Sequence, residues 1–168
     1  VASFPHWHHT FEIFPGVVTP GSYDPDFLLT KINFPADISN QRVLDIGSSD
    51  GYISLMTRRA GAEVVSIDYR PKNGHGFGVM EALSGYTFDY RQMNIYDLSV
   101  DKMWQFDHVV FMGFLYHLPD LIKSMAISWQ SVYLLRSMPG SSGSARCVER
   151  VHVATCMPAY GQGALGAR

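Results

Sequence analysis

An α/β fold with a mostly parallel sheet is predicted by two features of the sequence. From Gln41 onwards, strand-like and helix-like runs alternate along the chain, which is typical of βαβ units. Two strand-like runs, 64–67 and 108–112, are almost continuously apolar, as expected for strands that are covered on both faces. The chain has 168 residues, of which 46% are hydrophobic and 17% charged, so one domain with a sizeable core is expected.

Residues 1–40 are expected to form an aromatic and proline-rich wrap or lid over this domain. A short helix over 24–32 is predicted, because Asp24 can cap it and Pro25 suits its first helical position. A longer helix is excluded by prolines at near-regular spacing. These are Pro5, Pro15, Pro20, Pro25 and Pro35.

Residues 41–136 are expected to form the core. Gly61 stands where the end of the first helix favours a left-handed residue, and Arg58 and Arg59 can point outward from that helix. Its inward apolar stripe consists of Ile53, Leu55, Met56 and Ala60. Strands are predicted at 42–47, 63–68, 87–95, 106–113 and 131–137, and helices at 51–61, 79–85 and 118–129.

Residues 137–168 differ in texture from the core. They are rich in Gly, Ser and Ala, with one brief apolar run around 150–155. This C-terminal tail is predicted to be a loop with one edge strand and a loose end.

Composition argues against several kinds of partner. With 13 Lys and Arg against 15 Asp and Glu, the formal charge is -2, which gives no general attraction for a polyanion. The longest apolar run, 109–116, is far shorter than the roughly 20 residues of a membrane-spanning helix. Cys147 and Cys156 lack the spacing of a zinc site or a redox pair. We therefore expect a cytoplasmic protein without membrane contact.

The stretch VLDIGSSDG at 43–51 carries the main chemical signal. Gly47 and Gly51 follow a strand that ends near Asp45, and glycine lets a ligand pack directly on the backbone. The next helix offers free N–H groups and a positive dipole end. Asp68 ends the following strand about 20 residues later, where a carboxylate can accept hydrogen bonds from both ribose hydroxyls. Together these features predict a nucleoside site.

The loop favours a cationic nucleoside over a dinucleotide. A dinucleotide site calls for G-x-G-x-x-G, whereas this chain has Ser49 at the second glycine position and Asp50 in the loop, where it would repel a pyrophosphate. S-adenosylmethionine (SAM) has no phosphate and carries positive ammonium and sulfonium groups, which Asp45 and Asp50 can tolerate or assist. An NAD-dependent oxidoreductase is therefore a disfavoured alternative.

Four segments resemble class I SAM-dependent methyltransferases. VLDIGSSDG resembles their first motif, VVSID their ribose-binding second strand, YRQMNIYDL their third-strand segment and FDHVVFMGFLYHL their fourth strand and its loop. Residues 7–121 are most similar to the branch that modifies a wobble-position hydroxyuridine of transfer RNA, to methoxyuridine or carboxymethoxyuridine. Trp7, His9 and Glu12 match its W-x-H-x-x-E, followed by VTPG at 18–21 and FMGFLYHL at 111–118.

The resemblance implies a Rossmann-like three-layer α/β/α fold with SAM as cofactor. It implies that Asp45, Gly47, Ser49 and Gly51 surround the methionine part of SAM. Asp68 would hold the ribose hydroxyls. Full-length members have seven strands, whereas this chain has material for five, so the full set is not expected.

The same resemblance assigns the adenine and the methyl end of the site. Asn94 would accept from the adenine amino group, and the Ile95 N–H would reach a ring nitrogen. Met112 and Gly113 would line the floor beneath the sulfonium.

Tyr116 and His117 are the candidate catalytic residues. They follow the fourth predicted strand, at the carboxyl end of the sheet where open α/β folds bind substrates. Either could act as a base or orient the acceptor. The competing interpretation is that Tyr116 packs over SAM and His117 only caps or bonds backbone.

The N-terminal histidines invite a metal hypothesis that their spacing does not support. His6, His8 and His9 flank Trp7, but no Cys or carboxylate cluster completes a ligand set. No metal is therefore expected. His9 and Glu12 are instead expected to line or cover the acceptor pocket.

The acceptor is left open between a small molecule and an RNA base. The branch resemblance implies transfer-RNA modification, while the acidic balance and the lack of a basic run favour a small molecule. The tail at 137–168 departs from the final helix and hairpin of the family. A truncated, non-catalytic domain that binds SAM or a protein partner is therefore the alternative to an enzyme.

Overall fold

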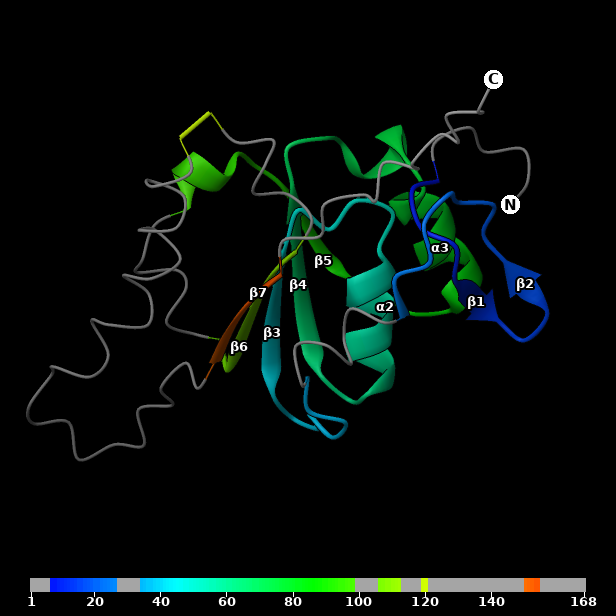
Figure 1. Cartoon of the computed structure of the whole chain (residues 1–168), viewed down its shortest axis with the longest axis horizontal. Helices are drawn as coiled ribbons and strands as arrows, with labels where there is room; N and C mark the ends of the chain where they lie inside the picture. The colour runs from blue at the N-terminus through cyan, green and yellow to red at the C-terminus, as the bar shows by residue number, and fades with distance from the viewer. Residues whose placement is uncertain (1–6, 27–33, 99–105, 113–118, 121–149, 155–168) are drawn as a thin grey trace, which may run out of the picture.

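The computed structural model describes residues 7–26, 34–98, 106–112, 119–120 and 150–154. Its centre is a five-stranded sheet in the order β5-β4-β3-β6-β7, in which every neighbouring pair is parallel (Figure 1). The strands are β3 (Arg42–Ile46), β4 (Glu63–Asp68), β5 (Asp89–Gln92), β6 (His108–Met112) and β7 (Arg150–Ala154). The predicted fold class is confirmed.

The order of the strands fixes where a ligand can bind. The chain runs outward from β3 through β4 to β5 and then returns to the other side of β3 for β6 and β7. Ile46 at the end of β3 pairs with Ile67 of β4 and with Phe111 of β6. The residues after Ile46 therefore leave the sheet where its strand order reverses, which is the usual ligand crevice of open α/β sheets.

Both faces of the sheet are buried, as its apolar strands require. On one face Val43 and Val110 pack in a cluster with Leu55 and Met80, which lie on α2 (Tyr52–Arg59) and α3 (Phe77–Ser84). A second cluster includes Leu44, Ile46, Val65, Ile67, Ile95, Leu98, Phe106, Val109 and Phe111. Neighbouring β3 residues thus alternate between the two clusters, as the period of a strand dictates.

Helix α2 ends as the sequence predicts. Gly61 has φ +90°, and the N–H groups of Gly61 and Ala62 donate to the carbonyls of Arg58 and Thr57, both at 3.1 Å. These bonds satisfy the last carbonyls of the helix. Arg59 is exposed, as predicted, and its guanidinium donates to the carbonyls of Glu12 and Ile13. No helix in the described ranges is long and apolar enough to cross a membrane.

The N-terminal segment contains an antiparallel hairpin that the sequence did not predict. It pairs β1 (Glu12–Phe14) with β2 (Val17–Val18). Trp7 and Phe11 beside it are buried and share a cluster with residues of α2 and α3. Asp24 Oδ1 accepts from the Asp26 N–H at 3.1 Å, while residues 27–33 of the predicted short helix lie outside the described residues.

The elements after β4 differ from the prediction at β5 and just before α3. β5 is shorter than the predicted 87–95, because the Asn94 side chain caps the short helix η2 (Ile95–Asp97). The expected edge strand of the tail is confirmed as β7, which pairs with β6. The strand predicted at 131–137 lies outside the described residues, as does the helix predicted at 118–129 except for residues 119–120. One further short helix, η1 (Lys72–Gly74), precedes α3.

We predict that Gly61→Ala destabilises the fold more than the matched change Gly85→Ala. Both glycines have positive φ, so alanine costs about 1 to 2 kcal/mol of backbone strain at each site. A Cβ on Gly61 would also lie 2.7 Å from Ser39 Oγ, whereas a Cβ on Gly85 meets nothing within 4 Å. Urea unfolding of the two variants measures the difference. Equal losses would contradict the close packing of Gly61 against Ser39.

Candidate functional site

The glycine loop, residues 47–51, makes a tight turn from β3 into α2. The N–H groups of Gly47 and Ser48 both donate to the Ile67 carbonyl, at 2.9 and 3.0 Å, and the Gly51 N–H donates to the Ser48 carbonyl at 2.8 Å. Positive φ angles of 76°, 51° and 90° occur at Gly47, Ser49 and Gly51. Glycine adopts these angles without strain, which explains why it stands at both ends of the loop.

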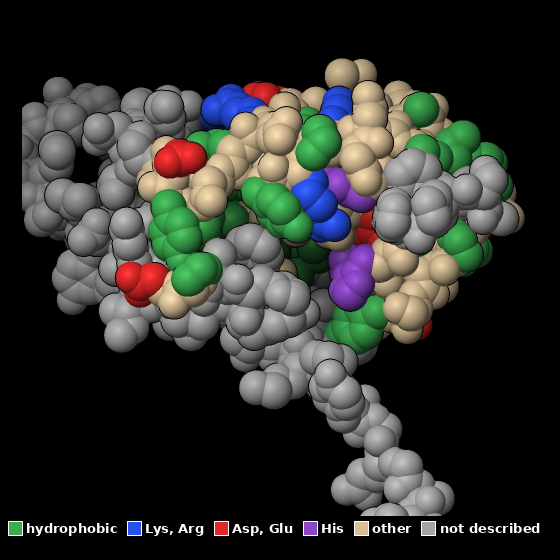
Figure 2. Space-filling model, turned by 90° about the horizontal axis from the view of Figure 1, so that it is seen from above, with side chains coloured by type: hydrophobic (Ala, Val, Ile, Leu, Met, Phe, Trp, Pro, Cys, Tyr) green, Lys and Arg blue, Asp and Glu red, His purple; other side chains and the backbone are tan. Residues whose placement is uncertain are grey.

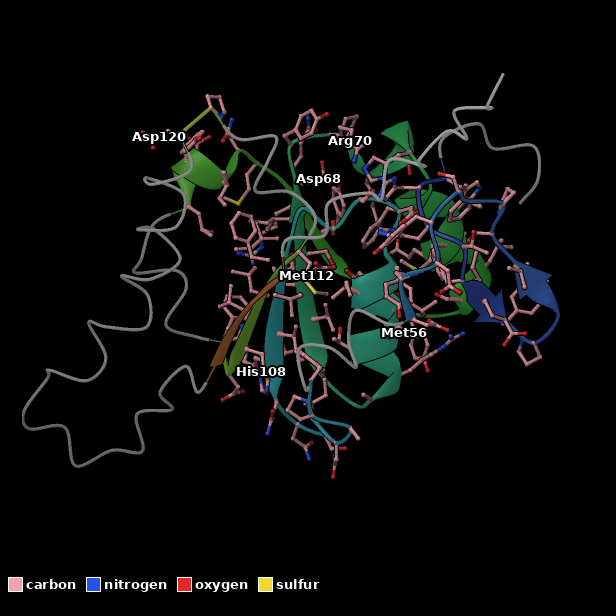
Figure 3. The ribbon with its side chains drawn as sticks, in the orientation of Figure 1. Met56, Asp68, Arg70, His108, Met112 and Asp120 are labelled. Atoms are coloured by element: carbon pink, nitrogen blue, oxygen red, sulfur yellow. The ribbon has the colours of Figure 1, made fainter. Side chains whose placement is uncertain are left out.

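Asp68 ties the end of β4 to this loop. The Ser49 N–H donates to its Oδ2 at 3.0 Å, and the Arg70 N–H donates to its Oδ1 at 3.0 Å. The Arg70 guanidinium lies 3.4 Å from the same Oδ1, and both side chains are labelled at the upper edge of the sheet in Figure 3. An ionised carboxylate has about four acceptor positions, so Asp68 keeps capacity for a further donor on Oδ2.

Asp45 lies beneath the loop in a buried polar network. The Ser54 hydroxyl donates to its Oδ2 at 2.6 Å, and Ser54 Oγ lies 2.7 Å from Ser66 Oγ on β4. Burial raises the pKa of Asp45 to about 7, and the nearby charge of Asp68 adds to the effect, although the Ser54 hydrogen bond opposes it. Asp45 therefore changes its charge near neutral pH.

The residues assigned to the adenine and the sulfonium lie at neighbouring strand ends. The Met93 N–H donates to the Asp68 carbonyl at 2.9 Å, which brings Asn94 next to the end of β4. Asn94 Oδ1 accepts from the Tyr96 N–H at 3.0 Å, and Ile95 is buried. Met112 is half-buried and follows Phe111, the partner of Ile46. By register Met112 therefore lies beside Gly47.

Asp50 has a role that the sequence did not predict. Its carboxylate is fully buried, and its Oδ2 accepts from the N–H groups of His8 and His9 at 2.8 and 2.7 Å. Its Oδ1 lies 2.5 Å from His9 Nδ1. Burial alone would raise the pKa of Asp50, but these hydrogen bonds and the His9 charge outweigh it and hold that pKa below its usual value.

The other sequence-predicted residues are placed as follows. Glu12 is exposed on β1 and accepts from the Gly16 N–H at 2.9 Å, so it serves the hairpin turn. Gly113 and the two candidate catalytic residues, Tyr116 and His117, lie outside the described residues. Across the described part of the chain, no group of three or more His, Cys, Asp or Glu side chains could hold a metal ion.

The charge balance of the site is acidic. Three buried carboxylates, those of Asp45, Asp50 and Asp68, lie in or beside the glycine loop. Among the described residues, the basic side chains that face these carboxylates are Arg70 and His9. Figure 2 looks onto the carboxyl ends of the strands and shows His, Lys or Arg and acidic side chains beside a hollow. Such a site suits a cationic ligand.

Comparison with known proteins identifies related sequences. Residues 44–130, just over half of the chain, match the protein family described as "Methyltransferase domain". The Ubiquinone biosynthesis O-methyltransferase of Xanthomonas euvesicatoria pv. vesicatoria is 34% identical over 92 residues, which are 55% of this chain and 38% of that protein. The chain thus spans well under half the length of this curated relative.

Solved structures share the fold. The N-terminal domain of EvdMO1 with S-adenosylhomocysteine (SAH) bound has a TM-score of 0.51 at 23% identity, covering 67% of this chain and 50% of that one. Magnesium protoporphyrin IX methyltransferase from Synechocystis PCC 6803 with bound SAM has a TM-score of 0.50 at 19% identity, covering 60% and 49%. At these identities the likeness concerns the fold alone.

We predict that the Asp45→Asn variant gains stability relative to the wild type as pH rises from about 4 to about 7. In this window folded Asp45 keeps its proton while unfolded Asp, with a pKa near about 3.9, loses it, so the wild type loses roughly 1.4 kcal/mol per pH unit. Asn has no such loss. Urea unfolding at about pH 5 and about pH 8 compares the two proteins.

The control for this experiment is Asp89→Asn, because Asp89 lies on the neighbouring β5 and its hydrogen bond with Arg91 lowers its pKa. This change should give no gain that grows with pH. A constant difference between wild type and Asp45→Asn across the window would contradict the raised pKa of Asp45.

Proposed function

Because this chain belongs to the methyltransferase-domain family, whose members use SAM as methyl donor, we propose that its glycine loop binds SAM. We further propose that the protein transfers the methyl group to a hydroxyl of a small molecule. The ubiquinone-biosynthesis relative extends well beyond the region that it shares with this chain, so the support for a substrate and an activity comes mainly from the site.

The cluster of buried carboxylates around the glycine loop carries this proposal. A buried ionised acid is costly unless a partner compensates its charge, and among the described residues the side chain that donates to Asp45 is the neutral Ser54 hydroxyl. The ammonium and sulfonium of SAM would supply positive charge beside Asp45. The Ser48 hydroxyl is also buried in the loop without a hydrogen-bond partner among the described residues. It offers a further polar contact.

Each residue then has a defined role. Oδ2 of Asp68 accepts from a ribose hydroxyl, while the Ser49 N–H keeps that carboxylate in place. Asn94 and Ile95 border the adenine, and Met112 lies below the reacting end. SAM supplies a methyl group already activated by its sulfonium, so the protein mainly positions the acceptor and excludes water. We propose that Tyr116 and His117 orient the acceptor and that Gly113 lines the floor of the site.

A small hydroxyl-bearing acceptor is preferred for two reasons. The curated relative reported above is named an O-methyltransferase of ubiquinone biosynthesis, and a small-molecule acceptor fits a chain with net charge -2. The transfer-RNA branch is not supported by this relative. An RNA base is therefore the less favoured acceptor.

A second candidate is a SAM-binding domain without catalytic activity. It is favoured by residues 137–168, whose Gly-, Ser- and Ala-rich composition departs from that of the core. Both candidates bind SAM, and only the enzyme turns it over. Formation of SAH in the presence of an acceptor therefore separates them.

We predict that Asp68→Asn weakens SAM binding by about 10- to 100-fold, because a charge-assisted hydrogen bond is worth roughly 1.5 to 3 kcal/mol. Asn keeps one carbonyl oxygen for the Ser49 N–H, so the loop retains its support. Isothermal titration calorimetry with SAM measures the effect.

The matched control is again Asp89→Asn, which removes the same charge from an exposed residue of the neighbouring strand. It should bind SAM like the wild type. The assignment of Asp68 to the ribose fails if both variants keep wild-type affinity.

A further inference from the structure

The His9 and Asp50 side chains form a pair that resembles the orienting half of a catalytic site. Asp50 Oδ1 lies 2.5 Å from His9 Nδ1. An ionised carboxylate can only accept a hydrogen bond, and the pKa of Asp50 is held low. Nδ1 of His9 must therefore carry the proton. In the neutral ring this leaves Nε2 with a lone pair that can accept a proton.

The pair does more than attach the N-terminal segment to the glycine loop. The N–H groups of His8 and His9 already tie that segment to Oδ2 of Asp50. The bond from the His9 ring to Oδ1 is additional, and it fixes the orientation and tautomer of the ring. Among the described residues, the His9 ring makes its hydrogen bond through Nδ1, and Nε2 makes none.

The ring of His9 is placed at the glycine loop. Asp50 belongs to the loop and directly precedes Gly51, and the His9 ring centroid lies 5.7 Å from that of Tyr52 and 6.0 Å from that of Tyr23. The His9 side chain is 16% exposed, whereas that of Asp50 is 0% exposed. The His9 side chain therefore keeps some contact with solvent, whereas its orienting carboxylate has none.

We propose that His9 is the general base that deprotonates a hydroxyl acceptor, and that Asp50 is its positioning residue. This inference rests on the proposed function. The acceptor oxygen forms a bond to the methyl carbon while the carbon–sulfur bond breaks and its electron pair stays on sulfur. The hydroxyl proton passes to His9 Nε2, and the imidazolium, paired with Asp50, later releases it to water. The acceptor class is a phenol or another weakly acidic alcohol, which needs such a base.

The surroundings of the ring fit this assignment. Asp50 in the loop is the acid in contact with the ring, at 2.5 Å between Oδ1 and His9 Nδ1, and Asp45 on β3 is buried beneath the same loop. The Tyr52 hydroxyl donates to Asp26 Oδ1 at 3.0 Å, so this phenol is engaged elsewhere. The His8 ring lies edge-on to the His9 ring at 4.6 Å between centroids and stacks on Tyr23 at 6.0 Å.

The test compares His9→Asn with the wild type. The amide nitrogen of Asn can replace Nδ1 as donor to Asp50, so the hydrogen bond to Asp50 is kept while the base is lost. With catechol as probe acceptor and SAM as donor, kcat should fall by about 100-fold or more. SAM affinity, measured by calorimetry, should stay within about 2-fold of the wild type, well under the roughly 1.4 kcal/mol that a tenfold change represents. The control Asp89→Asn, at an exposed residue of β5, should keep wild-type turnover.

The pH profile and a second variant separate a base from a structural residue. The His9→Asn rate should keep rising with pH as catechol ionises by itself, whereas the wild-type rate levels off once the base is deprotonated. Asp50→Asn retains an acceptor for the two backbone N–H groups but turns an N–H toward Nδ1. This favours the wrong tautomer, so kcat should fall here also.

One readout does not depend on turnover. The ¹⁵N resonances of the His9 ring in the SAH complex should show a protonated Nδ1 and an unprotonated Nε2, and added catechol should shift Nε2. An Nε2–H tautomer, equal turnover and pH profiles for His9→Asn and wild type, or loss of SAM binding in His9→Asn would each overturn the inference. A wild type that binds SAM but methylates no hydroxyl acceptor would instead overturn the proposed function, and the inference with it.

Discussion

The buried carboxylate of Asp50 is the interaction on which the arrangement of the site depends. An ionised acid away from water is tolerated only when donors compensate its charge. Here the donors are the backbone N–H groups of His8 and His9 and the ring nitrogen Nδ1 of His9. A third segment packs against the same point, because a Cβ on Gly76 would lie 2.6 Å from Trp7 Cε3 and 2.9 Å from Asp50 Cβ. The glycine loop, the N-terminal segment and the start of α3 therefore hold their places together.

The same burial makes the site electrostatically demanding. Asp45, Asp50 and Asp68 meet at the carboxyl ends of adjacent strands, and each is stabilised differently. Asp50 is paired with His9, Asp68 accepts backbone N–H groups and faces Arg70, and Asp45 has its pKa raised to about 7 mainly by burial. A ligand with positive charge relieves the least compensated of the three. This links the preference for SAM over a dinucleotide to the fold itself, because the acids belong to the strand ends and the loop.

Local sequence patterns predicted the backbone of the site, but they did not predict its contacts between residues far apart in the chain. Gly47, Gly51 and Gly61 adopt positive φ, a requirement that the residue type itself reveals. The end of β4 at Asp68 follows from an apolar run that stops at an acid. By contrast, the hydrogen bond between the His9 and Asp50 side chains joins residues 41 positions apart, and no local sequence pattern predicts it. The β1–β2 hairpin was missed because Pro15 was used only to exclude a long helix, although it lies at the turn of the hairpin.

Calorimetric titration of the wild-type chain with SAM, with NAD titrated in parallel, tests the central claim most directly. The acidic glycine loop should give saturable one-site binding of SAM, driven by the paired charges and the ribose contact, and NAD should give none because Asp50 and Asp45 oppose a pyrophosphate. Binding of NAD in place of SAM would contradict the account. So would a folded chain that binds neither nucleotide, since the loop would then serve only as a turn between β3 and α2.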